Sequence, residues 1–179
     1  MHNISYKVAL GGIISSLCLL CMFLTGIFPA LYITLPMIAG ILMMVISVEV
    51  NTRWAFLTFI ATSLLSVFVT FDKEAALLYI MLFGHYPIIK KYIDTIKIKL
   101  LRFITKIIIF NTCIICEIFI TIKVLGISEF YEEINEKGSI YAYGFLLIMN
   151  FVCLSYDHSL KGIFILYNKK LKPRLRSNY

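Results

Sequence analysis

The feature that most constrains this sequence is a set of apolar runs long enough to cross a lipid bilayer. A membrane-spanning helix needs about 20 mainly apolar residues, and the run at residues 100–126, LLRFITKIIIFNTCIICEIFITIKVLG, exceeds that length. Hydrophobic residues make up 60% of the chain and charged residues only 15%, whereas a soluble domain averages about 45–50% apolar residues. We therefore expect a polytopic membrane protein.

Short polar turns and prolines divide the 179 residues into six predicted spans. The predicted fold is an all-α bundle of six transmembrane helices that forms a single integral membrane domain, with no cleavable signal. Its spans are expected at residues 8–28, 31–50, 54–71, 74–93, 102–125 and 139–167, followed by a basic cytoplasmic tail at 168–179. Pro87 lies inside the fourth span, where the missing N–H predicts a kink.

The basic residues indicate how the chain is oriented. If the spans alternate in direction, fourteen Lys and Arg residues fall on one side of the membrane and three on the other, where the acidic segment 128–138 also lies. Loops rich in Lys and Arg remain in the cytoplasm. The sequence therefore predicts a protein of the cell membrane with both termini in the cytoplasm. The net charge of +7 is explained by this rule and gives no reason to expect nucleic acid as a partner.

Glu117 is the principal candidate for a functional residue, because it is an ionisable group well inside an apolar span. Such residues usually face a bundle interior or a water-filled cavity and often have a function. We expect Glu117 to lie in the outer half of the membrane, with Glu74 from the fourth span at a similar depth. Two interpretations remain open: Glu117 pairs with a solute, or it is protonated and hydrogen-bonds to another helix.

Other polar residues of the last three predicted spans are candidates for the same pocket. Asn111 lies deeper on the helix of Glu117, and Asn150 lies near the middle of the sixth span. Tyr79 and Tyr143 are expected in the outer half, where aromatic residues also occur as ordinary interfacial anchors. The predicted substrate-binding residues are Glu117, Asn111, Tyr79, Tyr143 and Asn150.

Other possible sites of chemistry have simpler structural explanations. Asp157 and His158 are adjacent on a helix and point about 100° apart, so a pair between Asp157 and Lys161 is favoured over catalysis. His85 is expected to take part in the kink near Pro87. Two C-x-x-C pairs lie within apolar spans, where thiols behave as small hydrophobic groups. No enzymatic activity, metal or cofactor is predicted, and the chain contains no nucleotide-binding Gly-rich loop or metalloprotease motif.

The first helix carries small residues that allow close packing with another helix. They are Ala9, Gly11, Gly12, Ser15 and Ser16, and the pairs at i and i+4 are small-x-x-x-small motifs. Another helix can therefore approach this one closely.

In its layout the chain resembles the substrate-binding S components of energy-coupling-factor vitamin transporters. The resemblance rests on the length, the six predicted spans, the internal termini and a first loop bracketed by Pro29 and Pro36. It implies capture of a vitamin or precursor from outside, with separate coupling and ATPase subunits as partners. It also implies that Ala9, Gly12 and Ser16, with Gly11 and Ser15 beside them, occupy the positions that dock on the transmembrane coupling subunit.

Two other functions remain open on sequence grounds. The first is a membrane scaffold or assembly protein without a ligand, which would recruit partners or anionic lipid through its small-residue face and basic tail. The second is a membrane-embedded enzyme that uses Glu117 or Asp157 and His158.

Overall fold

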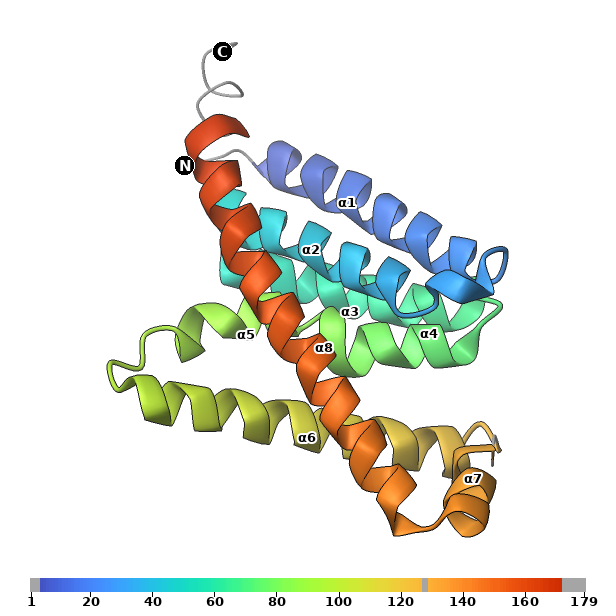
Figure 1. The fold of residues 1–179 in the computed structure, drawn as a ribbon. Coiled ribbons are helices and arrows are strands. Elements are labelled where there is room, and N and C mark those ends of the chain that lie inside the picture. The colour runs from blue at the N-terminus through green and yellow to red at the C-terminus, as the bar shows by residue number, and fades with distance from the viewer. Residues whose placement is uncertain (1–3, 127–128, 172–179) are drawn as a thin grey trace.

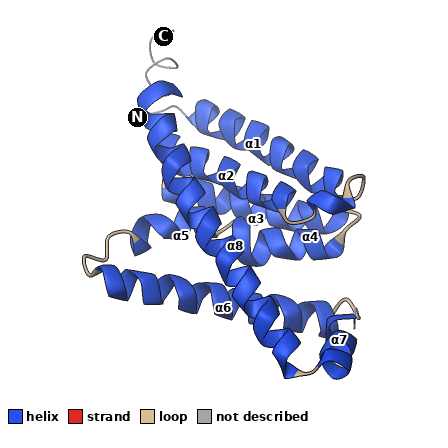
Figure 2. Cartoon of the chain, in the orientation of Figure 1, coloured by secondary structure: helices blue, strands red, loops and turns tan. Residues whose placement is uncertain are grey.

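The structure, a computed structural model, describes residues 4–126 and 129–171, and every regular element in these ranges is a helix (Figures 1 and 2). The long helices are α1 (Ile4–Thr25), α2 (Thr34–Glu49), α3 (Thr52–Val69), α6 (Lys99–Lys123) and α8 (Ser139–Leu166). Shorter elements are η1 (Pro29–Leu31), α4 (Lys73–Leu78), η2 (Tyr79–Phe83), α5 (Tyr86–Ile93), α7 (Glu129–Lys137) and η3 (Tyr167–Leu171). Residues 172–179 of the predicted tail lie outside the described ranges.

The all-helical class is confirmed, and four of the helical segments are long and apolar enough to cross a membrane. These segments are α1, α3, α6 and the stretch Ser139–Lys169 that contains α8. Helix α2 is apolar but has only 16 residues, and the predicted fourth span is divided among α4, η2 and α5. The fold is therefore that of a helical protein suited to a membrane, while the number of spans and their orientation stay predictions.

The predicted kink in the fourth span is present, but its cause differs from the expected one. The break lies at Gly84 and His85, where the Gly84 N–H donates to the Tyr79 carbonyl in a π-helical turn, with an N···O distance of 2.7 Å. His85 Nδ1 lies 3.2 Å from the Ile80 carbonyl oxygen. Pro87 begins the new helix α5, where a missing N–H costs no hydrogen bond. Pro87 therefore starts a helix and does not bend one.

Side-chain caps and glycines set the ends of several helices. Asn51 accepts a hydrogen bond from the Trp54 N–H at the start of α3, and Asp72 accepts from two backbone N–H groups at the start of α4. Gly126 and Gly138 have φ angles of 69° and 79°, a conformation that favours glycine. In the acidic segment between them, residues 129–137 form α7.

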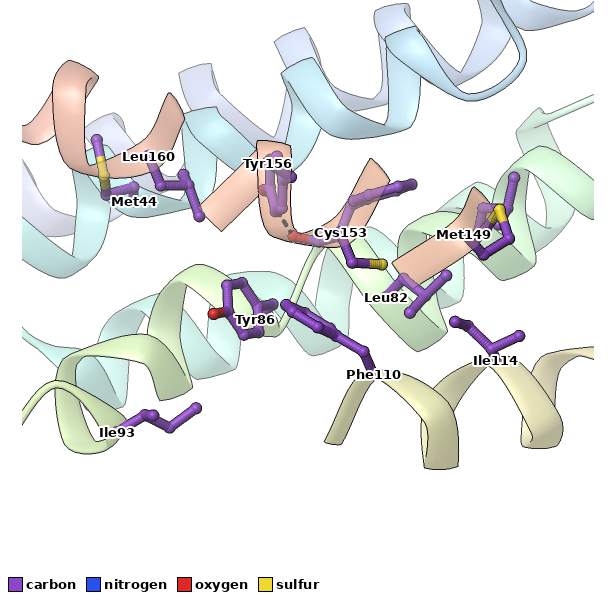
Figure 3. Packing of buried hydrophobic residues seen from close by; sticks show 12 residues of the cluster. Met44, Leu82, Tyr86, Ile93, Phe110, Ile114, Met149, Cys153, Tyr156 and Leu160 are labelled. Atoms are coloured by element: carbon purple, nitrogen blue, oxygen red, sulfur yellow. Dashed lines mark hydrogen bonds between the residues drawn. The ribbon is translucent and has the colours of Figure 1, made fainter. Parts of the chain in front are cut away.

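The helices enclose two hydrophobic clusters. One joins α1, α2 and α3 around Cys18, Met22 and Met43. The other joins α2, the π-helical turn and α5 with α6 and α8, and it includes Phe110 and Tyr156 (Figure 3). Helix α8 crosses the direction of the other long helices (Figure 1), and it contacts both α2 and α6.

Large apolar side chains also cover the outside of the helices. Phe68 on α3 is 84% exposed, and Leu64, Ile108, Leu147 and Phe151 are exposed on three different helices. Water would oppose so much outward-facing apolar surface, whereas lipid tails solvate it. This surface agrees with a membrane location.

Gly40 allows α2 to pack closely against the π-helical turn and α8. A Cβ atom there would overlap the Phe83 carbonyl oxygen and the Tyr156 hydroxyl, and these two groups are joined by a hydrogen bond of 3.1 Å (Figure 3). We predict that Gly40→Ala lowers the free energy of unfolding by roughly 1–3 kcal/mol, because packed backbone must move. Thermal unfolding in detergent would measure this change. Gly162→Ala is the matched control, since a Cβ there meets nothing within 4 Å; an equal effect of both substitutions would contradict the steric explanation.

Candidate functional site

A cavity of about 230 Å³ is lined by residues of α7 and of the helix ends near it. Helix α7 packs against α8 at this end of the bundle (Figure 1). The cavity walls come from the connection between α1 and α2 and from α4, α6, α7 and α8. The apolar wall residues are Ile33, Leu78, Ile118, Ile122, Phe145 and Met149, and the polar ones are Tyr32, Glu74, Glu117, Thr121 and Glu133. Ligand pockets typically measure about 300–1,000 Å³, so this cavity suits a small solute.

The Glu117 side chain lines the cavity, and the residue is only 8% exposed. Helix α6 places Thr121 one turn further on the same face, and Thr121 lines the cavity as well. Glu74 reaches the cavity from α4, whose start is fixed by the Asp72 cap. The two carboxylates thus come from helices that are separated in sequence but adjacent in space.

Glu133 is the third carboxylate of the cavity, and it comes from α7. The pKa of Glu133 is lowered because Tyr141 and Lys137 donate hydrogen bonds to its carboxylate. Its Lys137 partner lies 3.0 Å away and is itself exposed. Glu133 is therefore an ionised group at the rim, whereas Glu117 lies deeper.

The cavity walls contain three acidic side chains and no basic one among the residues that the structure describes. Such a set of carboxylates attracts a positively charged group and repels an anion, and the effect is strongest at the buried Glu117. In these same ranges, no three His, Cys, Asp or Glu side chains are grouped so that they can hold a metal ion.

The other four predicted substrate-binding residues lie outside this cavity. Asn150 donates to the Asn111 side-chain oxygen over 2.9 Å, so these two residues join α8 to α6. Tyr79 is completely buried in the cluster formed by α1, α2 and α3. Tyr143 is 72% exposed on α8, as expected of an interfacial aromatic. Of the predicted set, the structure places only Glu117 in the cavity wall.

The small residues of α1 divide into two faces. Ser15 accepts a hydrogen bond from the Thr62 hydroxyl of α3 over 3.2 Å, and a Cβ at Gly11 would lie 3.3 Å from Thr58. Gly11 and Ser15 therefore pack inside the protein.

The remaining three small residues face outward. Ala9, Gly12 and Ser16 are exposed, and a Cβ at Gly12 would meet nothing within 4 Å. They leave a shallow stripe along α1 that is open to another helix.

A network of charges is buried at the opposite end of the bundle. Asp157 of α8 is 6% exposed. Its carboxylate accepts hydrogen bonds from Lys90 and from Tyr86 of α5, the latter over 2.7 Å. Lys106 of α6 donates to it over 2.7 Å. Lys161 lies 3.6 Å from it, so the predicted pair is confirmed as one part of a larger network.

The sequence analysis missed this network and most of the cavity. Lys106 is one of the fourteen basic residues that predict the orientation, although it lies within the predicted span 102–125. A basic and an acidic residue inside two apolar helices, Lys106 and Asp157, would have been a usable signal, since such charges are normally paired. Glu133 gave no such signal, because acidic residues are common in surface segments.

No family model, curated protein or solved structure matches this chain.

Proposed function

We propose that this protein is a membrane-embedded substrate-binding subunit that captures a small solute with a positively charged group. The observation that carries the proposal is the buried Glu117 carboxylate in the cavity wall. Glu74 and Glu133 line the same cavity, and no basic side chain of the described residues does. A cationic solute would neutralise charges that are costly in apolar surroundings. An anionic solute would not gain this favourable free energy, so the site selects cationic over anionic solutes.

The site's construction supports capture rather than chemical conversion. Its apolar walls can contact the body of a solute while the carboxylates orient the charged group, which is the usual division of roles in a ligand pocket. The cavity lies where the connection between α1 and α2 meets α7.

The proposed transport cycle follows from the resemblance to S components of vitamin transporters. The solute, a vitamin or its precursor, would enter from outside the cell, and the bundle would then reorient against a transmembrane coupling subunit driven by separate ATPase subunits. The exposed stripe of Ala9, Gly12 and Ser16 supports a helix contact of this kind. Six spans and cytoplasmic termini belong to this proposal, with the basic residues on the inner side.

The test is a ligand screen on the detergent-purified protein. Native mass spectrometry would detect a co-purified solute, and thermal unfolding would be followed with cationic thiamine and pyridoxamine, neutral riboflavin, and anionic pantothenate. We expect stabilisation by a cationic compound and none by pantothenate, because a ligand that binds the folded state raises its stability by mass action. An apo mass combined with no stabilisation by any compound, or preferential stabilisation by the anion, would contradict the proposal.

A further inference from the structure

A second and larger pocket lies at the opposite end of the bundle, and its walls have the reverse charge. Its volume is about 600 Å³. Four basic side chains and one acidic side chain line it: Lys90, Lys91, Arg102, Lys161 and Asp94. Unlike the Glu117 cavity, this pocket therefore favours an anion.

The basic side chains differ in how far the fold itself uses them. Lys90 is buried and bound to Asp157 and Asp94, and Lys161 lies near Asp157. Within residues 4–126 and 129–171, no ion pair involves Lys91 or Arg102. These two cations come from different helices and line the same pocket, so they are available to a ligand.

The rest of the pocket wall is largely apolar. Leu160 and Phe164 of α8 line it together with Met44 and Val48 of α2. Phe164 is half-exposed and belongs to a segment that is apolar enough to cross a membrane. The pocket thus combines a cationic part with an apolar wall that continues onto the outward surface of α8.

We propose that this pocket binds one phospholipid with an anionic headgroup. The headgroup phosphate contacts Lys91 and Arg102, since the guanidinium group of Arg can form paired hydrogen bonds to phosphate oxygens. An acyl chain lies along Phe164 and the neighbouring apolar residues of α8. Arg102 lies near the start of the membrane-length helix α6, which is the depth at which headgroups occur. Basic pockets between helices at this depth are suited to anionic lipid.

The experiment compares lipids with inorganic phosphate as probes. The purified protein is titrated in detergent micelles with phosphatidylglycerol, phosphatidylcholine or inorganic phosphate alone, while thermal unfolding and native mass spectrometry report binding. We expect one retained phosphatidylglycerol molecule and a raised melting temperature. Phosphatidylcholine and inorganic phosphate are expected to give neither. Equal protection by inorganic phosphate, or equally tight binding of phosphatidylcholine, would overturn the proposal.

Charge variants test whether the pocket is the binding site. Lys91→Gln with Arg102→Gln is expected to weaken phosphatidylglycerol binding about thirtyfold, which corresponds to about 1 kcal/mol for each lost charge. Lys91→Arg with Arg102→Lys keeps both charges, and its affinity for phosphatidylglycerol should remain within about threefold of that of the natural protein. A loss of affinity in the glutamine variant alone would therefore be caused by the lost charges and not by misfolding.

The matched control removes two cations from outside the pocket wall. Lys7→Gln with Arg53→Gln lowers the net charge by the same amount, and neither residue lines the pocket. We expect phosphatidylglycerol binding to this variant to change by less than threefold. If it fell as far as in the Lys91 and Arg102 variant, the attraction would be a general property of the basic surface, and the site would be rejected. The test is independent of the Glu117 cavity, which lies at the other end of the bundle.

Discussion

Glu117→Gln is expected to weaken binding of a cationic solute by at least about thirtyfold while the protein remains folded. Removing one partner of a buried charge pair costs about 2 kcal/mol or more in binding, and about 1.4 kcal/mol corresponds to a factor of ten. Glutamine preserves the shape of the side chain and removes a charge that is costly in apolar surroundings. The melting temperature without solute should therefore be unchanged or slightly higher. Isothermal titration with the cation identified by the ligand screen would measure the loss.

A control variant on α7 separates the cavity from general electrostatics. Glu136→Gln removes the same charge from the helix that carries Glu133, but Glu136 does not line the cavity. It should change affinity less than threefold. If Glu117→Gln bound the cation as well as the natural protein, the cavity would not be the binding site.

The same substitution distinguishes the three functions left open by the sequence. A transport subunit loses solute binding and keeps its fold. A scaffold protein shows little change in partner recruitment. A membrane-embedded enzyme that uses Glu117 as a catalytic group retains substrate binding but loses turnover.

Asp157→Asn is expected to cause the largest loss of stability, roughly 3–5 kcal/mol. Asp157 pairs with two nearly buried lysines, Lys90 and Lys106, which the partly exposed Asp94 also contacts. Without the Asp157 charge, one carboxylate remains for these two buried cations, which leaves an uncompensated charge. Asparagine retains the shape but replaces one acceptor oxygen by an N–H donor, so the effect combines the lost charge with a lost hydrogen bond. Thermal or denaturant unfolding in detergent would measure it.

Two further variants test that explanation. Lys161→Ala removes a cation that is near the same carboxylate but half-exposed, and exposed pairs contribute about 0–1 kcal/mol. The double variant Asp157→Asn with Lys106→Met removes one of the stranded charges and should regain part of the stability. If Asp157→Asn cost no more than Lys161→Ala, the buried network would have no special role in the fold.

Much of the local structure could be predicted from the sequence. Apolar runs of membrane length predicted the helices. In a helix every backbone N–H and C=O can be hydrogen-bonded within the segment, while the apolar side chains face lipid or the protein core. A break near Pro87, the pair of Asp157 with Lys161 and the placement of Glu117 away from solvent were also predicted. The first two predictions rest on residues within about one or two helical turns of each other. The third rests on the free-energy cost of exposing a single carboxylate to apolar surroundings.

Contacts between distant residues were decided by the tertiary structure alone. Helical periodicity shows which residues share a face, but it does not show where two helices cross. Because α8 crosses the other long helices (Figure 1), Asn150 meets Asn111 and not Glu117. The same crossing brings Asp157 to Lys106, 51 residues away in sequence.

The Glu117 cavity and the basic pocket also show which features follow from the sequence and which follow only from the tertiary structure. The sequence by itself determined that an acid in an apolar helix needs a polar enclosure. Only the folded chain decided that Glu74 and Glu133 complete this enclosure and that Lys91 and Arg102 share a pocket at the other end. The physical reason is that the free-energy cost of burying a charge depends on the residue that carries it, and this residue can be read from the sequence. Which groups compensate that charge depends on how the helices pack.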